Sequence, residues 1–168
     1  MYRNPIVTAI TSLGLEHQNV LGNTLEEITM AKAGIMKPAV PCFTLNTHPP
    51  HILRLLQERA AAVKVSSELI PLEFKCLLKF LLQCPLFVVP PLESYEKLPT
   101  MKMDDGRVTR MNASIAIQLA TAFVHHKYPE LLKGVYSIGS PFQLLSWHLT
   151  GLSNCFWSGR FQVTILNS

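Results

Sequence analysis

The stretch Ser12–Lys37, SLGLEHQNVLGNTLEEITMAKAGIMK, predicts a loop followed by a short helix, and the rest of the fold is inferred from it. Its residues 24–27 (TLEE) have the pattern of a capping box. In such a box the Thr24 hydroxyl accepts a hydrogen bond from the backbone N–H of Glu27, whose carboxylate accepts one from the N–H of Thr24. A helix is therefore predicted to begin here. Gly34 predicts its end, because glycine readily adopts the left-handed conformation that follows a last helical turn.

One lysine lies on the apolar side of this predicted helix. Leu25, Ile28 and Lys32 stand at positions i, i+3 and i+7, so the side facing the core carries two apolar residues and one ammonium group. A lone lysine of this kind usually extends to water or lies near the carbonyl groups at the helix C-terminus. A buried lysine with a chemical role is the alternative.

The residues before this stretch predict a buried strand. Pro5–Thr11 (PIVTAIT) is a continuous apolar and β-branched run, which is typical of a parallel strand covered on both faces. In open α/β sheets ligands bind beyond the carboxyl ends of the strands, and His17 follows this strand directly. We expect a central strand whose carboxyl end brings His17 and Lys32 into one pocket. A histidine with only a structural role in the loop is the alternative.

The same residues resemble a known enzyme family. SLGLEHQNVLGNT and AKAGIMK are similar to the pattern SLGxDH…LGxT…KAGIxK in the central domain of folylpolyglutamate synthases, which are Mur-ligase-like enzymes. The resemblance implies that His17 is a magnesium ligand and that Lys32 is carbamylated. Carbamylation would replace a buried ammonium by an anion that orients a hard cation. Glu16 stands where the family usually has aspartate, so its carboxylate lies one methylene further out.

Three further elements are predicted between residues 40 and 89. Val40–Leu45 and Leu86–Val89 have the composition of buried strands. Pro49 and Pro50 open an amphipathic helix that continues to Ala62. Two histidines flank these prolines and are expected to cap the helix or to face solvent, namely His48 and His51.

Two weaker resemblances concern the nucleotide. Asn112–His126 predicts an alanine-rich helix whose start is similar to the family pattern HQxxNAxxAIxLA, in which the asparagine lies near the nucleotide base. The HQ positions here are Val108 and Thr109, so half of that pattern is absent, and Asn112 as a helix cap is an equal alternative. Residues 157–160 (WSGR) are similar to WxGR, which implies that Arg160 reaches the nucleotide phosphates as a bidentate donor.

Residues 65–83 have no counterpart in the resemblance. They form either an additional helix at Phe74–Gln83 or translated non-coding sequence, and the clean return of the family pattern after them slightly favours the second. We expect them to leave the sheet and to pack poorly. The predicted fold is α/β, a partial parallel-sheet Mur-ligase-like central domain of the P-loop ATPase type over residues 1–163, with 65–83 as an insertion and 164–168 as a tail.

The sequence contains no GxxxxGK[ST] phosphate loop. In the family that loop lies upstream of the matching region, and a DGAH motif and a C-terminal domain lie downstream. We therefore expect an incomplete part of an ADP-forming tetrahydrofolate:L-glutamate γ-ligase, inactive alone. The alternative is a non-catalytic remnant, or a fragment that binds folate or a partner chain. The resemblance implies ATP and Mg²⁺, with tetrahydrofolate or folylpolyglutamate and L-glutamate as substrates, and a monomer in the full-length form.

Charge and hydropathy exclude two classes of partner. The net charge is +4 and the basic residues are scattered, which argues against a nucleic-acid surface and favours a small anionic ligand. The most hydrophobic run, Leu77–Pro91, is interrupted by Lys79 and Pro85 and is too short to span a bilayer.

The cysteines indicate a reducing compartment. They have no CxxC spacing and no secretory leader precedes them, so we expect free thiols rather than disulfides or zinc ligands. The expected location is the cytoplasm, with the mitochondrion as a further compartment of the full-length form. The four residues are Cys42, Cys76, Cys84 and Cys155.

Overall fold

The computed structural model describes residues 5–63, 83–101, 106–134 and 136–156 of the chain. The elements are, in order, β1 (Thr8–Ile10), α1 (Gln18–Leu21), α2 (Leu25–Ala33), β2 (Cys42–Leu45), α3 (Pro50–Ala62), β3 (Leu86–Val89), α5 (Arg107–Lys127) and α6 (Ser146–Asn154), with short 3₁₀ turns at Leu92–Ser94 and Pro129–Leu132. All the predicted strands and helices within the described residues are therefore present. No helix among these residues is long and apolar enough to cross a membrane.

The described sheet has three parallel strands in the order β1-β2-β3. Cys42 of β2 is paired with Thr8 of β1 and with Leu86 of β3, which fixes the register across the sheet. The prediction of a strand within Pro5–Thr11 is confirmed, but its predicted central position is wrong. β2 occupies the centre because all four of its residues are buried, whereas β1 forms an edge of the described sheet.

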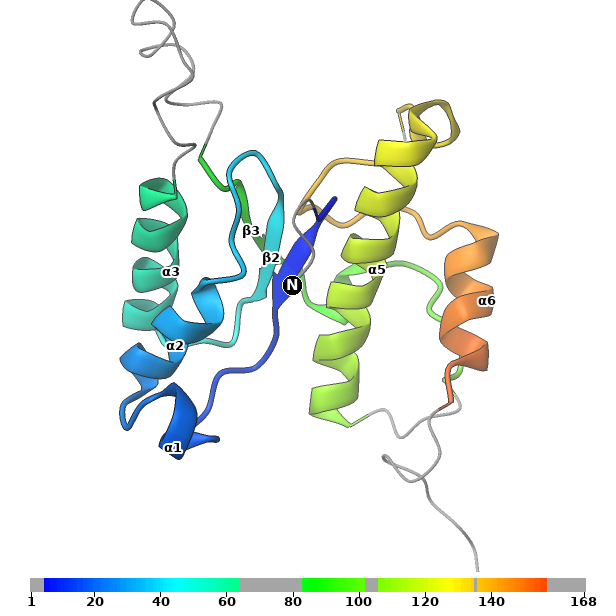
Figure 1. Ribbon diagram of the computed structural model, residues 1–168. Helices are drawn as coiled ribbons and strands as arrows, with labels where there is room; N and C mark the ends of the chain where they lie inside the picture. The colour runs from blue at the N-terminus through cyan, green and yellow to red at the C-terminus, as the bar shows by residue number, and fades with distance from the viewer. Residues whose placement is uncertain (1–4, 64–82, 102–105, 135, 157–168) are drawn as a thin grey trace, which may run out of the picture.

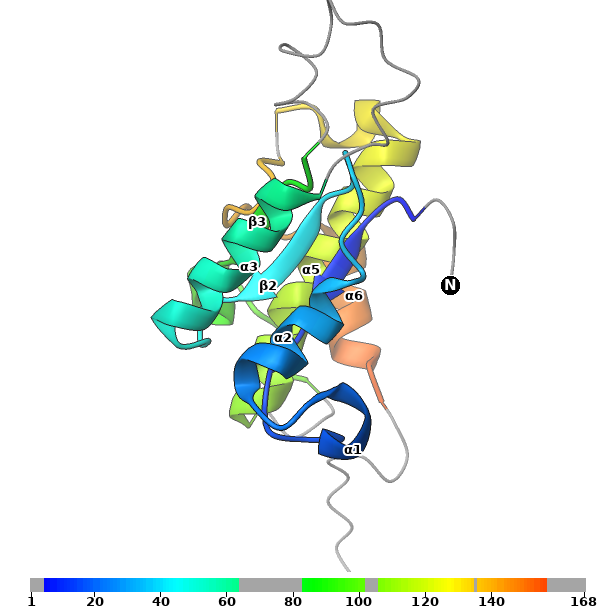
Figure 2. The same cartoon turned by 60° about the vertical axis from the view of Figure 1, so that its left-hand side comes forward.

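Helices cover both faces of this sheet (Figure 1). α2 and α3 lie on one face and α5 on the other, with α6 outside α5, as the turned view also shows (Figure 2). Side chains of β2 alternate between the two layers. Cys42 packs in a cluster with Leu56 and Ala60 of α3, whereas Phe43 and Leu45 pack with residues of α5.

The capping box at the start of α2 is confirmed. Thr24 Oγ1 accepts from the backbone N–H of Glu27 at 3.2 Å, and Glu27 Oε2 accepts from the backbone N–H of Thr24 at 3.3 Å. The helix ends before Gly34 as predicted, but the predicted left-handed glycine is wrong, since Gly34 has φ −58° and ψ −15°. The chain instead closes with a tight turn in which the N–H of Met36 donates to Ala33, and Met36 enters the core with 2% exposure.

α5 is longer than the sequence predicted. It begins at Arg107 with Gly106 as its N-cap, before the predicted start at Asn112, so the alternative of Asn112 as a helix cap is wrong. Residues 107–110 contain no glycine or proline, so the helix can extend through them despite their polar composition. The helix ends at Lys127, one residue after the predicted end at His126, because Pro129 disfavours a helical conformation at Tyr128.

A buried histidine attaches α6 to α5. His148 is 4% exposed, and its Nδ1 accepts a hydrogen bond from the backbone N–H of Leu145 at 3.0 Å. The ring proton must then be on Nε2, which donates to Thr121 Oγ1 at 2.8 Å. Thr121 Oγ1 in turn donates to the carbonyl of Ile117 at 2.6 Å. A charged imidazole cannot accept at Nδ1, so this arrangement requires the neutral form.

We predict that stability falls with acidification because of His148. Burial lowers the pKa of His148 to about 4, whereas an unfolded histidine titrates near about 6.5. The unfolded chain therefore binds the proton first, and the stabilisation present above about pH 6.5 is lost as the pH falls toward about 4. The full pKa difference corresponds to about 3 kcal/mol, and partial solvent screening reduces the expected loss to the order of 2 kcal/mol. His148→Gln should reduce this pH dependence in urea unfolding, and exposed His126→Gln should not; equal slopes for the two variants would contradict the assignment.

The ends of the unmatched segment lie next to each other. Cys84 N donates to the Ala60 carbonyl at 3.2 Å, and Ala39 N donates to the Gln83 carbonyl at 3.0 Å. α3 and the residues leading into β3 are thus joined directly. The predictions of a helix at Phe74–Gln83 and of poor packing of residues 65–83 fall, apart from Gln83, outside the described residues.

We predict that the fold does not depend on residues 65–82. Their replacement by a short glycine-serine linker should change the melting temperature by only a few degrees, because loop-closure entropy varies slowly with loop length. The measurement is thermal unfolding followed by circular dichroism. Loss of the cooperative transition in the linker variant would mean that this segment contributes to the core.

Candidate functional site

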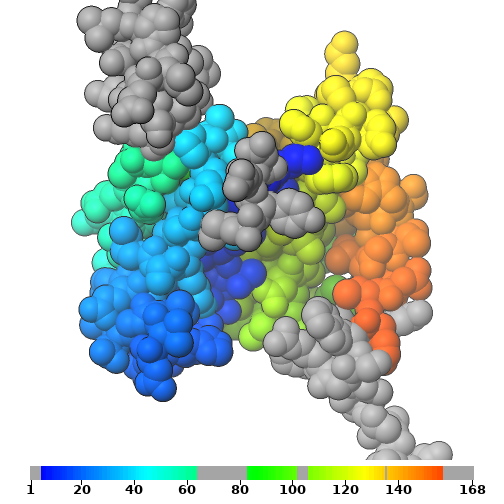
Figure 3. All heavy atoms as spheres, viewed as in Figure 1, coloured from blue at the N-terminus to red at the C-terminus, as the bar shows by residue number. Residues whose placement is uncertain are grey.

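The candidate site lies at the carboxyl edge of the sheet. Since the three strands are parallel, the loops that follow them leave from the same edge. These loops contain residues 11–17 after β1, 46–48 after β2 and 90–93 after β3. Figure 3 shows that the segment containing α1, in deeper blue, lies on the outside of the molecule.

His17 begins α1 in an unusual backbone conformation. Its φ is 53° and its ψ 37°, in the left-handed region that few residues other than glycine adopt. The conformation costs on the order of 1 kcal/mol and directs the His17 carbonyl to accept from the N–H groups of Val20 and Leu21, at 2.9 and 3.0 Å. The His17 side chain is exposed. Ala39 and Lys97 have a positive φ as well, so the loop is a candidate because it follows β1 at the carboxyl edge of the sheet.

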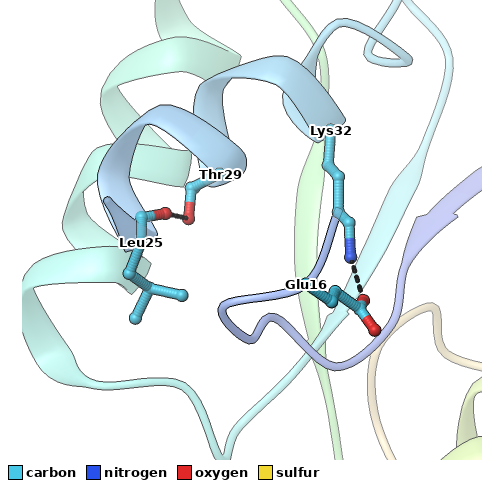
Figure 4. Close-up of polar contacts among 4 residues, drawn as sticks. All are labelled: Glu16, Leu25, Thr29 and Lys32. Carbon is cyan, nitrogen blue, oxygen red and sulfur yellow. Dashed lines mark hydrogen bonds and ion pairs between the residues drawn. The ribbon is translucent and has the colours of Figure 1, made fainter. Parts of the chain in front are cut away.

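Lys32 makes an ion pair with the neighbour of His17. The distance from Lys32 Nζ to Glu16 Oε1 is 2.7 Å, and the side chains are 26% and 55% exposed (Figure 4). The hydrogen bond from Lys32 lowers the pKa of Glu16, and the charges of Lys32 and His17 add to this effect. Lys32 is thus half-buried, as its place on the apolar side of α2 predicted. Glu16 connects it to the His17 loop, although a common pocket for His17 and Lys32 stays a prediction.

His48 was missed by the sequence analysis. The expectation that it would cap a helix or face solvent is wrong, because it is 6% exposed and its Nε2 lies 3.1 Å from Thr44 Oγ1. Burial lowers the pKa of His48, and the positive charge of Lys32 lowers it further. His51 is exposed and lies 3.3 Å from Glu26. The sequence signal for His48 was its position soon after a buried strand, at the edge where ligands bind.

A cavity of about 470 Å³ opens at the carboxyl ends of β2 and β3, against the first turns of α5. Arg110 Nε donates to Glu93 Oε1 at 2.6 Å on its wall, and Ser114 Oγ donates to the Pro90 carbonyl at 2.6 Å. The cavity is lined by Leu45–Thr47, Val89–Glu93, Arg107, Arg110, Met111 and Ser114. A second cavity, of about 730 Å³, lies at the opposite edge beside Pro5, Pro41 and Tyr136.

Asn112 and Arg160 are the two residues that the sequence predicted to contact the nucleotide. Asn112 is exposed on α5 between cavity-lining Met111 and Ser114, but it does not itself line the cavity. Arg160 lies outside the described residues. Their roles stay predictions.

The side chains at the β1 loop could bind a hard cation only if the Lys32 amine were converted to an anionic group such as a carbamate. Among the described residues, no group of three His, Cys, Asp or Glu side chains could hold a metal ion. The unmodified Lys32 amine donates to Glu16 and would repel a cation. A carbamate at Lys32 would add oxygen ligands beside Glu16 and His17, and its negative charge would repel the Glu16 carboxylate unless a cation were bound. Cys42 and Cys84 are buried free thiols.

Comparisons with known proteins show which proteins the chain is similar to. The chain is 32% identical over 173 residues to the mitochondrial folylpolyglutamate synthase of Cricetulus griseus, covering 96% of the chain and 26% of the relative. It is 32% identical over 160 residues to the folylpolyglutamate synthase of Saccharomyces cerevisiae (strain YJM789), covering 95% of the chain and 25% of the relative. The chain thus spans about a quarter of the length of these curated relatives. No protein-family model matches it.

The fold is similar to that of a solved FPGS–AMPPCP–folate complex, in which FPGS stands for folylpolyglutamate synthase. The TM-score is 0.55 at 21% identity, and the match covers 93% of this chain and 35% of the solved one. Because the sequence match extends over nearly the whole chain and the fold match agrees with it, the chain belongs to the folylpolyglutamate synthase family and corresponds to part of a member's length.

Proposed function

We propose that this chain is part of an enzyme that adds L-glutamate to tetrahydrofolate or folylpolyglutamate and converts ATP to ADP. The single observation that carries the proposal is the Glu16–Lys32 ion pair beside His17, at the carboxyl edge of a parallel sheet, in a chain that matches folylpolyglutamate synthases. A solved relative bound to AMPPCP, an ATP analogue, and to folate supports both substrates. The substrates and the monomeric state belong to the whole protein, of which this chain supplies one part.

The proposed reaction has two steps. The γ-carboxylate of the folate glutamate attacks the terminal phosphate of ATP, which forms an acyl phosphate and releases ADP. The amine of the incoming glutamate then attacks the acyl carbon and displaces phosphate, which forms the new amide. Catalysis of phosphoryl transfer depends mainly on positioning and on electrostatic stabilisation of the transferred group. This chain's contribution would be the charged groups of the β1 loop.

In this proposal His17 and carbamylated Lys32 hold Mg²⁺. The ion would offset negative charge on the transferred phosphoryl group. Formation of the carbamate would require Lys32 to leave Glu16, whose carboxylate would then be available as a further oxygen ligand.

We place the nucleotide along the same edge. Asn112 would lie near the base, and Arg160 would bind the phosphates as a bidentate donor. The cavity between the β2 and β3 loops and α5 supports this arrangement because its wall includes Arg107 and Arg110. The negative charge of the proposed nucleotide suits the net positive charge of the chain. The cytoplasm and the mitochondrion are the compartments we propose, since one similar protein is named mitochondrial.

We predict that His17 and Lys32 are required for glutamate addition. In the full-length protein that contains this chain, His17→Ala and Lys32→Ala should each lower the rate at least about 100-fold, because each removes a group that stabilises charge in the transition state. The measurement is incorporation of labelled glutamate into tetrahydrofolate. His51→Ala, an exposed histidine on α3, is the matched control.

The chain of 168 residues by itself should show no such incorporation. Glutamate addition by this chain alone would refute the expectation of an incomplete enzyme. Full activity of both alanine variants in the longer protein would instead favour a chain that only binds folate or a partner.

We also predict a carbamate on Lys32. Incubation of the full-length protein with ¹³C-bicarbonate and Mg²⁺ should give a carbamate carbon signal that is absent in Lys32→Arg and retained in Lys37→Arg. Withdrawal of Mg²⁺ should reduce the signal, because the carbamate and Glu16 repel each other without a cation between them. An unlabelled Lys32 under all these conditions would remove the carbamate from the proposal.

A further inference from the structure

The buried His48 belongs to a hydrogen-bonded chain that the proposed reaction does not use. Its Nε2 lies 3.1 Å from Thr44 Oγ1, and Thr44 Oγ1 donates to the carbonyl of Ile10 at 3.2 Å. Thr44 is fully buried in the central strand, and Ile10 is the last residue of β1. These two hydrogen bonds therefore connect His48, in the loop after β2, through Thr44 of the central strand to the carboxyl end of β1.

Both hydrogen bonds can exist together only if His48 carries a hydrogen on Nε2. The carbonyl of Ile10 can only accept, so the single hydroxyl hydrogen of Thr44 is directed to it. Thr44 Oγ1 must then accept from His48, which requires a hydrogen on Nε2 and, in the neutral ring, a lone pair on Nδ1. Burial and the charge of nearby Lys32 favour the neutral ring. The geometry thus assigns a single tautomer to His48.

The Ile10 carbonyl, which accepts the hydrogen bond from Thr44, lies directly before the loop that contains the candidate site residues Glu16 and His17. Residues 11–17 follow Ile10 directly, and Glu16 in that loop is paired with Lys32 at 2.7 Å. A rotation of the Ile10 peptide would change the direction in which the loop leaves the sheet. Positioning errors of about 1 Å at a reacting group cost on the order of 100-fold in rate.

We propose that His48 is a positioning residue of this site: through the Thr44 hydroxyl it fixes the carboxyl end of β1 and thereby holds the loop of Glu16 and His17 against Lys32. The part of this inference that concerns turnover rests on the proposed function. The part that concerns the loop does not.

The molecule contains a matched control for this arrangement. His148, Thr121 and the carbonyl of Ile117 form the same sequence of donors and acceptors, with distances of 2.8 and 2.6 Å. The hydrogen bonds of this second set, among the described residues, link α6 and Leu145 to α5 and do not include the loops of the carboxyl edge. Equivalent substitutions in the two chains therefore separate a positioning effect from general loss of stability.

The first experiment measures the tautomer and the loop in the full chain. Long-range ¹H–¹⁵N spectra should show His48 with its hydrogen on Nε2. Thr44→Val should lower the backbone ¹⁵N order parameters of residues 11–17 from about 0.85, typical of rigid backbone, to below about 0.6, whereas Thr44→Ser, which keeps the hydroxyl, should leave them unchanged. Thr121→Val should leave the order parameters of this loop unchanged. A hydrogen on Nδ1, or equal loop order parameters in Thr44→Val and wild type, would overturn the inference whether or not glutamate is added.

The second experiment measures turnover in the full-length protein. His48→Asn, whose amide is too short to reach Thr44, should lower kcat for glutamate addition about 10- to 100-fold, as is common when a supporting hydrogen bond to a site is removed. His48→Gln, whose amide nitrogen can take the place of Nε2, should restore most of the loss. His148→Asn should lower the melting temperature and leave kcat within about threefold. Equal kcat losses in His48→Asn and His148→Asn would overturn the positioning role, whereas absence of turnover in the wild type would refute only the proposed function.

Discussion

Parallel pairing of β2 with β1 on one side and β3 on the other determines where every candidate functional residue lies. The register joins Thr8, Cys42 and Leu86 across the sheet, and it brings the loops after the three strands to one edge. A shift of one residue would turn each side chain of β2 to the opposite layer. Thr44 would then point away from the hydrogen bonds with Ile10 and His48, and Phe43 would lose its packing against α5.

Burial in the packed sheet and helices also determines which polar side chains must find hydrogen-bond partners. A hydroxyl or amide inside a packed sheet must find partners, because an unpaired one costs about 1 to 3 kcal/mol. Thr44 is satisfied by groups on both neighbouring segments. Gln118 of α5, also fully buried, donates to Tyr95 and to the Ser140 carbonyl and accepts from Gly139 N–H. The first network ends at the candidate site, whereas the second attaches residues 139–140 to the core.

Sequence predicted the parts of this structure that local chemistry decides. The capping box at Thr24, the proline at the start of α3 and the β-branched strands each depend on neighbouring residues, and all three are confirmed. Gly34 was predicted incorrectly because burial of Met36, a tertiary effect, favoured a right-handed turn. The edge position of β1 likewise depends on strand pairing, which a single strand's composition does not encode.

For the candidate site, sequence located the His17 loop and Lys32 but not their partners. The ion pair to Glu16 depends on how α2 crosses the loop, and the burial of His48 depends on packing after β2. We propose above all that the nucleotide binds at this carboxyl edge of the sheet. Hydrogen exchange of the full-length protein with and without AMPPCP tests it most directly. We expect new protection in residues 11–17, 44–48 and 90–93, and protection confined to the opposite edge, at residues 39–41 and 136–138, would contradict the claim.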